Sequence, residues 1–276
     1  MNAPASFRTS DGVRLVYDDL GARDDVPVVL CHGIAAAGEQ LADDARFFAG
    51  RGYRVLLPDL RGHGRSDRPP KPTSESLSIA RLALDLEEML DHAGTAPVHW
   101  AGNSLGGILA LHLLGARAHR FRTLATFGTA YRLDLPRWIG SLIPFGYGII
   151  GARMTGWLTA LTTTRNTAAR PLIARLVRDF DPRVGGTLAA NLARYDLIAN
   201  ATAVRLPILL LRGGRDTSLN AALGPTLAAM QERPNFELVD LPDAGHCANL
   251  DATKQWRQAL LNFWARNDPD ARPARA

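Results

Sequence analysis

A serine between two glycines, in the stretch Gly102-Asn103-Ser104-Leu105-Gly106, constrains the fold of this chain more than any other feature. A short apolar run, residues 97–101, precedes it, and a helical run, residues 107–116, follows it. Glycines two residues before and after the serine permit a turn that is too sharp for larger side chains. The pattern predicts a strand–turn–helix corner that lifts the Ser104 hydroxyl above a sheet, with the N-terminus of the helix beneath it.

Apolar strands alternate with helices through most of the chain. We expect a hairpin over residues 7–18, because Asp11-Gly12 favours a tight turn. The alternation predicts an α/β fold, a mostly parallel sheet covered by helices on both faces. Further strands are predicted at residues 26–31, 54–58, 98–101, 123–127, 208–211 and 236–241, and further helices at 40–51, 78–92, 221–233 and 253–266.

Residues 131–199 interrupt this alternation with helical stretches rich in Trp, Gly and Arg. We therefore expect a mainly helical cap inserted into a core made of residues 1–130 and 200–266. Residues 267–276 are rich in Pro, Ala, Arg and Asp, which predicts a disordered tail.

The composition is that of a soluble globular chain, with 276 residues, 46% hydrophobic and 21% charged. Residues 1–12 contain no apolar segment typical of a signal peptide, and Gly and Pro interrupt the longest apolar stretch, residues 139–150. The chain has two cysteines, too few for a disulfide framework. These features favour a cytoplasmic location.

The net charge of +5 is concentrated in the expected cap, where the sequence has nine arginines and four carboxylates. Such a surface can be a solvated basic face, or it can attract an acidic substrate group or an anionic membrane. Peripheral membrane contact through the basic cap therefore stays open. No basic run is interleaved with aromatic residues, so we expect no nucleic-acid partner. The oligomeric state is not determined by the sequence.

A serine hydroxyl needs a neighbouring base to become nucleophilic. His246 follows the predicted strand 236–241, and Asp216 follows the predicted strand 208–211. Because the carboxyl ends of parallel strands meet at one sheet edge, these residues are expected to join Ser104 as base and orienting acid. Asp216 could instead cap a turn or helix. The backbone N–H groups of Ile34 and Leu105 are the candidate donors for an oxyanion.

Taken together, these motifs closely resemble the α/β-hydrolase superfamily, over about residues 7–130 and 200–266. The order Ser, then Asp, then His is the order of that superfamily. The resemblance implies an α/β-hydrolase fold and a serine hydrolase that needs neither metal nor organic cofactor. It is carried by Cys31-His32-Gly33-Ile34, the loop from Pro58 to Ser66, the Ser104 corner, Gly213 to Asp216, and Gly245-His246.

The cap is expected to determine the substrate. Trp138, Ile143, Phe145 and Trp157 are candidates for the wall of a pocket that takes a small lipophilic substrate. The simplest hypothesis is hydrolysis of carboxylic esters with a lipophilic acyl group. The alternatives are a lactone or amide hydrolase, for example of acylated homoserine lactones, a carbon–carbon bond hydrolase, and a non-catalytic ligand-binding protein on the same fold.

Overall fold

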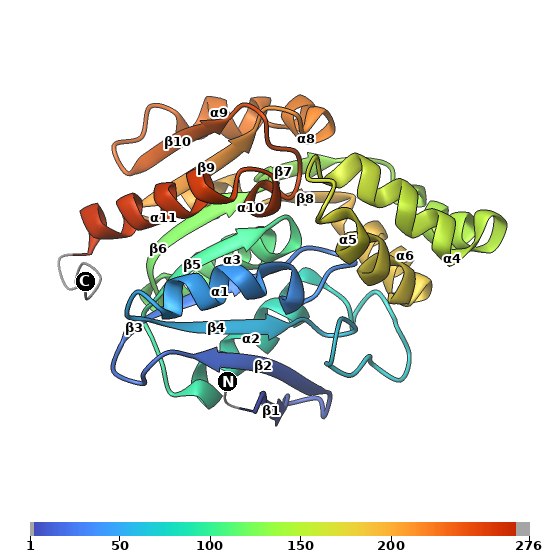
Figure 1. Ribbon diagram of the computed structural model, residues 1–276, viewed down its shortest axis with the longest axis horizontal. Coiled ribbons are helices and arrows are strands. Elements are labelled where there is room, and N and C mark those ends of the chain that lie inside the picture. Colours follow the sequence, from blue (N-terminus) through green and yellow to red (C-terminus); the bar gives the residue numbers. More distant parts are fainter. Residues whose placement is uncertain (1–2, 269–276) are drawn as a thin grey trace.

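The computed structural model describes residues 3–268, and its core is an eight-stranded sheet (Figure 1). The strand order is β1-β2-β4-β3-β5-β6-β9-β10. Only β2 runs against its neighbours, β1 and β4, and every other pair is parallel, which confirms the predicted α/β class. The strands are β1 (Ala5–Arg8), β2 (Arg14–Leu20), β3 (Val26–Cys31), β4 (Tyr53–Asp59), β5 (Val98–Asn103), β6 (Phe121–Phe127), β9 (Ile208–Gly213) and β10 (Phe236–Leu241).

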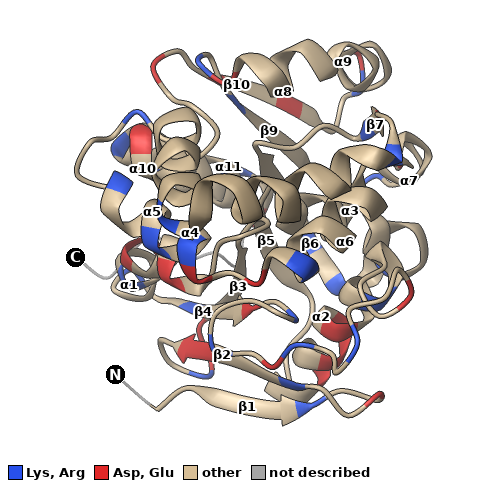
Figure 2. Cartoon of the chain, turned by 90° about the vertical axis from the view of Figure 1, so that its right-hand side faces the viewer, with Lys and Arg blue, Asp and Glu red and all other residues tan. Residues whose placement is uncertain are grey.

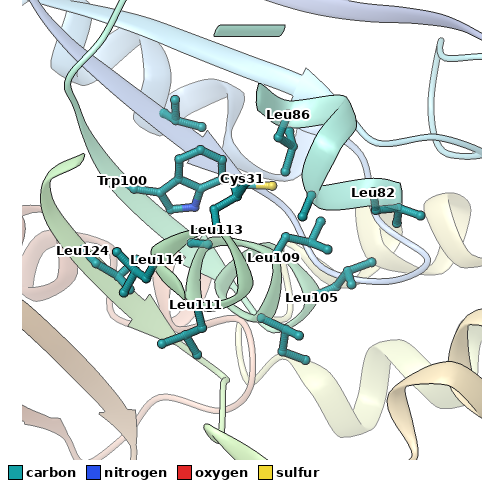
Figure 3. Close-up of a cluster of buried hydrophobic side chains, with 14 of the residues drawn as sticks. Cys31, Leu82, Leu86, Trp100, Leu105, Leu109, Leu111, Leu113, Leu114 and Leu124 are labelled. Carbon is teal, nitrogen blue, oxygen red and sulfur yellow. The ribbon is translucent and has the colours of Figure 1, made fainter. Parts of the chain in front are cut away.

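Helices cover both faces of the sheet, and each face has its own apolar core. On one face, α2 (Ile79–Ala93) and α3 (Leu105–Arg117) pack around Trp100 of β5 (Figure 3). On the other, α1 (Ala42–Ala49) and α11 (Thr253–Asn267) enclose a second cluster. Because the central strands are buried on both faces, they are continuously apolar, as a parallel sheet requires.

The helices expected at residues 40–51 and 221–233 are each divided. The first begins as a 3-10 turn, η1 (Gly38–Leu41), before α1 starts. The second is replaced by α8 (Thr217–Ala222) and α9 (Gly224–Met230). Pro225 explains the division, because in the middle of one long helix it would have removed a hydrogen bond. In the first turn of α9, its missing N–H is tolerated. The remaining short elements are η2 (Ala118–Arg120), α7 (Ile198–Thr202) and α10 (Ala248–Asp251).

The segment from β7 to β8, between β6 and β9, lies beyond the carboxyl ends of the parallel strands, where the arrowheads point in Figure 1. Its helices lie above that edge of the sheet. A two-stranded antiparallel ribbon pairs the two ends of the insertion, a feature that three-residue strands do not reveal in the sequence. The segment contains β7 (Arg132–Asp134), η3 (Arg137–Ser141), α4 (Leu142–Thr163), α5 (Arg170–Asp179), α6 (Pro182–Leu192) and β8 (Arg194–Asp196).

The C-terminal helix extends slightly further than the sequence indicated. Asn267 still belongs to α11, and the buried carboxylate of Asp268 accepts a hydrogen bond from Arg122. These two residues are therefore folded, although they were assigned to a disordered tail. The rest of that predicted tail, residues 269–276, lies outside the described residues. Among the helices of residues 3–268, none has the length and hydropathy needed to cross a bilayer.

Candidate active site

Ser104 occupies the strained corner that the two glycines predict. It lies between β5 and α3 with φ +48° and ψ −113°, a backbone conformation that non-glycine residues rarely adopt. A Cβ on Gly102 would come within 2.5 Å of the Gly106 backbone, and one on Gly106 within 2.4 Å of the Cys31 carbonyl oxygen. The Ser104 N–H donates to the carbonyl of Phe127 at 2.9 Å, which holds the corner against β6.

His246 and Asp216 are joined side chain to side chain. The distance between His246 Nδ1 and Asp216 Oδ2 is 2.7 Å. Since a carboxylate only accepts, Nδ1 carries the proton, and Nε2 is the nitrogen with a lone pair for a further proton. The other carboxylate oxygen of Asp216 accepts from the N–H of Leu219 at 3.4 Å and caps α8. Asp216 therefore both caps a helix and orients the imidazole.

Ser104 and His246 line one cavity of about 370 Å³ beneath α4 and α5. This volume lies within the range of small-molecule sites. The loop after β3 forms another wall of the cavity, and a Cβ on Gly33 would lie 3.2 Å from the Cβ of Ser104. The serine, the imidazole and the loop that carries Ile34 therefore converge on one cavity.

Asn103 joins the serine corner to the histidine loop. Its amide group donates to the backbone carbonyls of Phe127 and His246, each at 3.2 Å, and its oxygen accepts from Gln40 at 3.0 Å. The carbonyl of Gln40 in turn accepts from the side chain of Asn249 at 3.1 Å. No sequence motif indicated these contacts of Asn103, or a role for Gln40 or Asn249.

Asp251 fastens the histidine loop to the cap. Its carboxylate accepts from the N–H of Gly245 at 2.7 Å, and from the N–H groups of Arg165 at 2.9 Å and Asn166 at 3.1 Å. Because these donors belong to both the loop and the segment after α4, the imidazole is held relative to the roof of the cavity.

The sequence profile of the alpha/beta hydrolase family matches residues 28–259. The chain belongs to that family. A non-heme chloroperoxidase of Streptomyces lividans is 38% identical over 41% of this chain, but the match spans only 40% of the chloroperoxidase. A 2-hydroxymuconate semialdehyde hydrolase of Pseudomonas putida is 28% identical, covering 93% of this chain and 92% of its own.

Solved structures agree with this assignment. A hydrolase from Pseudomonas aeruginosa PA01 superposes with a TM-score of 0.83 and is 26% identical, covering 94% of this chain and 97% of its own. An esterase from Exiguobacterium antarcticum gives a TM-score of 0.82 at 18% identity, covering 95% and 99%, a likeness of fold alone. The resemblance inferred from the motifs is therefore confirmed, and the chain is an alpha/beta hydrolase.

In this alpha/beta hydrolase, His32 shapes the loop that carries Ile34. Its Nδ1 donates to the Gly33 carbonyl at 2.7 Å, and its Nε2 accepts from the N–H of Leu60 at 3.0 Å. Complete burial lowers the pKa of His32, so the ring stays neutral and keeps both hydrogen bonds. Ile34 lines the cavity, and Leu105 is the first residue of α3, directly after Ser104.

The structure corrects the expected pocket wall. Ile143 lines the cavity, but Trp138, Phe145 and Trp157 face outward and are 64%, 64% and 53% exposed. Helical spacing separates the cavity-lining side chains from the outward-facing ones, because the lining positions recur mostly every three or four residues along α4. These lining residues of α4 are Leu142, Ile143, Gly146, Tyr147, Ile150, Thr155, Thr159 and Thr163, and Ile173 and Val177 of α5 join them with Phe180.

Cys247 also lines the cavity, directly after His246. Its burial raises the pKa of the thiol to about 12, so the sulfur stays protonated near neutral pH. A protonated, buried thiol is a poor nucleophile. Ser104 is therefore the stronger nucleophile candidate in this cavity.

Proposed function

We propose that this alpha/beta hydrolase is a serine hydrolase that cleaves carboxylic esters with a lipophilic acyl group. The observation that carries the proposal is the charge of the cavity. No lysine, arginine, aspartate or glutamate lines it among the described residues, and apolar side chains of α4 and α5 dominate. Because an anionic substrate group buried there would find no cation, a neutral, lipophilic substrate fits best.

In the proposed mechanism, Ser104 attacks the ester carbonyl while His246 Nε2 takes the hydroxyl proton. Asp216 orients His246 through the 2.7 Å hydrogen bond and stabilises the imidazolium. The N–H groups of Ile34 and Leu105 hold the oxyanion. The alcohol departs with the proton from His246, and water, deprotonated by the same imidazole, then releases the acid and restores the serine.

Carbon–carbon bond cleavage is the second candidate. The nearly full-length similarity to 2-hydroxymuconate semialdehyde hydrolase favours it. So does Asn103 before the serine, which resembles the corresponding position in carbon–carbon bond hydrolases. The uncharged cavity favours the ester over this candidate, because 2-hydroxymuconate semialdehyde carries a carboxylate.

A chain-length series of p-nitrophenyl esters tests the proposal. We expect kcat/KM to rise from acetate to octanoate, and Ser104→Ala to lower kcat by several orders of magnitude. Ester hydrolysis that persists at the parental rate in Ser104→Ala would exclude the mechanism. A marked preference for acetate would exclude the lipophilic acyl group.

A further inference from the structure

The outer side of α4 is apolar and exposed to solvent. Ile149 is 66% exposed, and Trp138, Phe145 and Trp157 are more than half exposed. Trp138 lies in η3, directly before α4, and the others lie in α4 on both sides of its kink at Gly151. We call this surface the α4 outer face: Trp138, Leu142, Phe145, Ile149, Ile150, Met154, Trp157 and Leu158.

The α4 outer face is larger than scattered apolar residues on a surface would be. A fully exposed Trp or Phe side chain presents about 200 Å², so Trp138, Phe145 and Trp157 alone leave roughly 350 Å² in water. The largest apolar patch on a typical monomer is about 300–600 Å² in total, and the aliphatic members extend this one further. Apart from neighbouring Leu135, the other large apolar side chains exposed in the described structure are only Leu84 and Leu238.

The surroundings of this face are basic. From residue 135 to residue 178 the chain contains six arginines and no aspartate or glutamate. Arg137 and Arg153 are exposed within the segment that carries the face, and neither forms an ion pair with any residue between 3 and 268. Figure 2 views the molecule from the side of α4 and α5, where basic segments lie on these helices.

We propose that the α4 outer face docks on a membrane surface that contains anionic phospholipids. Its aromatic and aliphatic side chains would enter the boundary between headgroups and acyl chains, as amphipathic interfacial helices do. Arg137 and Arg153 would pair with lipid phosphates. A second copy of the chain fits less well, because it would bring arginines against arginines with no carboxylate on this face to neutralise them.

The cavity and the α4 outer face share two residues. Leu142 and Ile150 line the cavity and are also 48% and 45% exposed, so they border its mouth at α4. A docked molecule would therefore present this mouth to the bilayer. A lipophilic molecule dissolved in the membrane reaches the cavity without first crossing water.

Co-sedimentation of the full chain with vesicles tests the proposal. We expect binding to vesicles that contain phosphatidylglycerol and much weaker binding to pure phosphatidylcholine. The pair Phe145→Gln with Trp157→Gln should abolish binding. The pair Arg137→Gln with Arg153→Gln should weaken vesicle binding roughly fivefold for each arginine. Salt at about 1 M should also weaken binding, because the Debye length falls to about 3 Å.

Two matched pairs control for general loss of apolar or basic surface. Leu84→Gln with Leu238→Gln removes the exposed apolar residues of the core, and Arg23→Gln with Arg205→Gln removes exposed core arginines. Both should bind vesicles like the parent. Thermal melting verifies that each protein is folded, and Ile149→Gln replaces the aromatic pair if that pair unfolds.

Three results would overturn the proposal. The first is a parent protein that ignores phosphatidylglycerol vesicles. The second is a loss of binding in the control pairs as large as in the test pairs. The third is a dimer, seen by sedimentation equilibrium without lipid, that the Phe145 and Trp157 substitutions dissociate, because a second copy would then cover the face.

Discussion

Replacement of Asn103 by alanine tests how the histidine loop is positioned. The Asn103 side chain is 2% exposed and makes three hydrogen bonds, to the carbonyls of Phe127 and His246 and to the amide of Gln40. Asn103→Ala removes all three without disturbing Ser104 directly. The perturbation therefore separates anchoring of the loop from the chemistry of the serine.

The expected loss of stability follows from these contacts. A neutral hydrogen bond contributes about 1 kcal/mol net. The carbonyl of Phe127 keeps two other donors, the Ser104 N–H and the Thr129 hydroxyl, so its share is small. We expect Asn103→Ala to lower the free energy of unfolding by about 2 kcal/mol. Release of the His246 backbone should also lower kcat/KM by about tenfold to a hundredfold, since a 1 Å misplacement of a catalytic group costs about that much.

Asn235→Ala is the matched control. Its amide also donates to two backbone carbonyls, of Val204 at 3.2 Å and Leu206 at 2.8 Å, but at the amino-terminal edge of the sheet. Urea unfolding and kcat/KM on p-nitrophenyl octanoate compare the two variants. Both should lose similar stability, and only Asn103→Ala should lose activity. Equal kcat/KM in the two variants would refute the positioning role.

Three further predictions concern buried His63, the cavity residue Gly146, and Asp216. His63 is buried against Phe180, with ring centroids 4.6 Å apart, and burial lowers its pKa to about 3. The unfolded chain therefore binds a proton that the native one does not, and stability falls as the pH drops from about 6.5 toward 3, by about 1.4 kcal/mol per pH unit. His63→Phe should remove the contribution of His63 to this loss of stability at low pH. Urea unfolding midpoints measured at two pH values test this, and a shift between them as large as in the parent would contradict it. Gly146 lines the cavity, and a Cβ there would meet no atom within 4 Å. Gly146→Leu should therefore fill the cavity and lower kcat/KM far more for the octanoate ester than for the acetate ester. An equal loss for both esters would count against the cavity as the acyl site. Asp216→Asn should lower kcat roughly ten-thousandfold by disturbing the tautomer of His246, and wild-type turnover in that variant would remove Asp216 from the mechanism.

The parallel core was predictable because its signals are local. Strands buried on both faces are continuously apolar, and the helices between them begin and end with recognisable residues. The helix from Ile79 to Ala93, for example, starts at the capping side chain of Ser78 and ends at Gly94 with φ +62°. The Ser104 corner was predictable for the same reason, since two glycines report a local backbone constraint.

Other features depend on contacts that periodicity does not reveal. The helix α4 carries apolar side chains on its inner and outer sides alike, so its pattern could not tell Ile143 inside the cavity from Phe145 outside it. The polar contacts of Asn103 with Gln40, and of Gln40 with Asn249, join segments far apart in the chain. The structure brings Asp216 against His246 as expected. Their catalytic roles, and that of Ser104, stay predictions.

Covalent trapping of the nucleophile tests the central claim most directly. A fluorophosphonate should phosphonylate the folded chain once, on the peptide that contains Ser104, as mass spectrometry identifies it. Ser104→Ala should remove the adduct, and Asp216→Asn should slow its formation. A folded protein that resists the probe, or that reacts at another residue, would contradict the account.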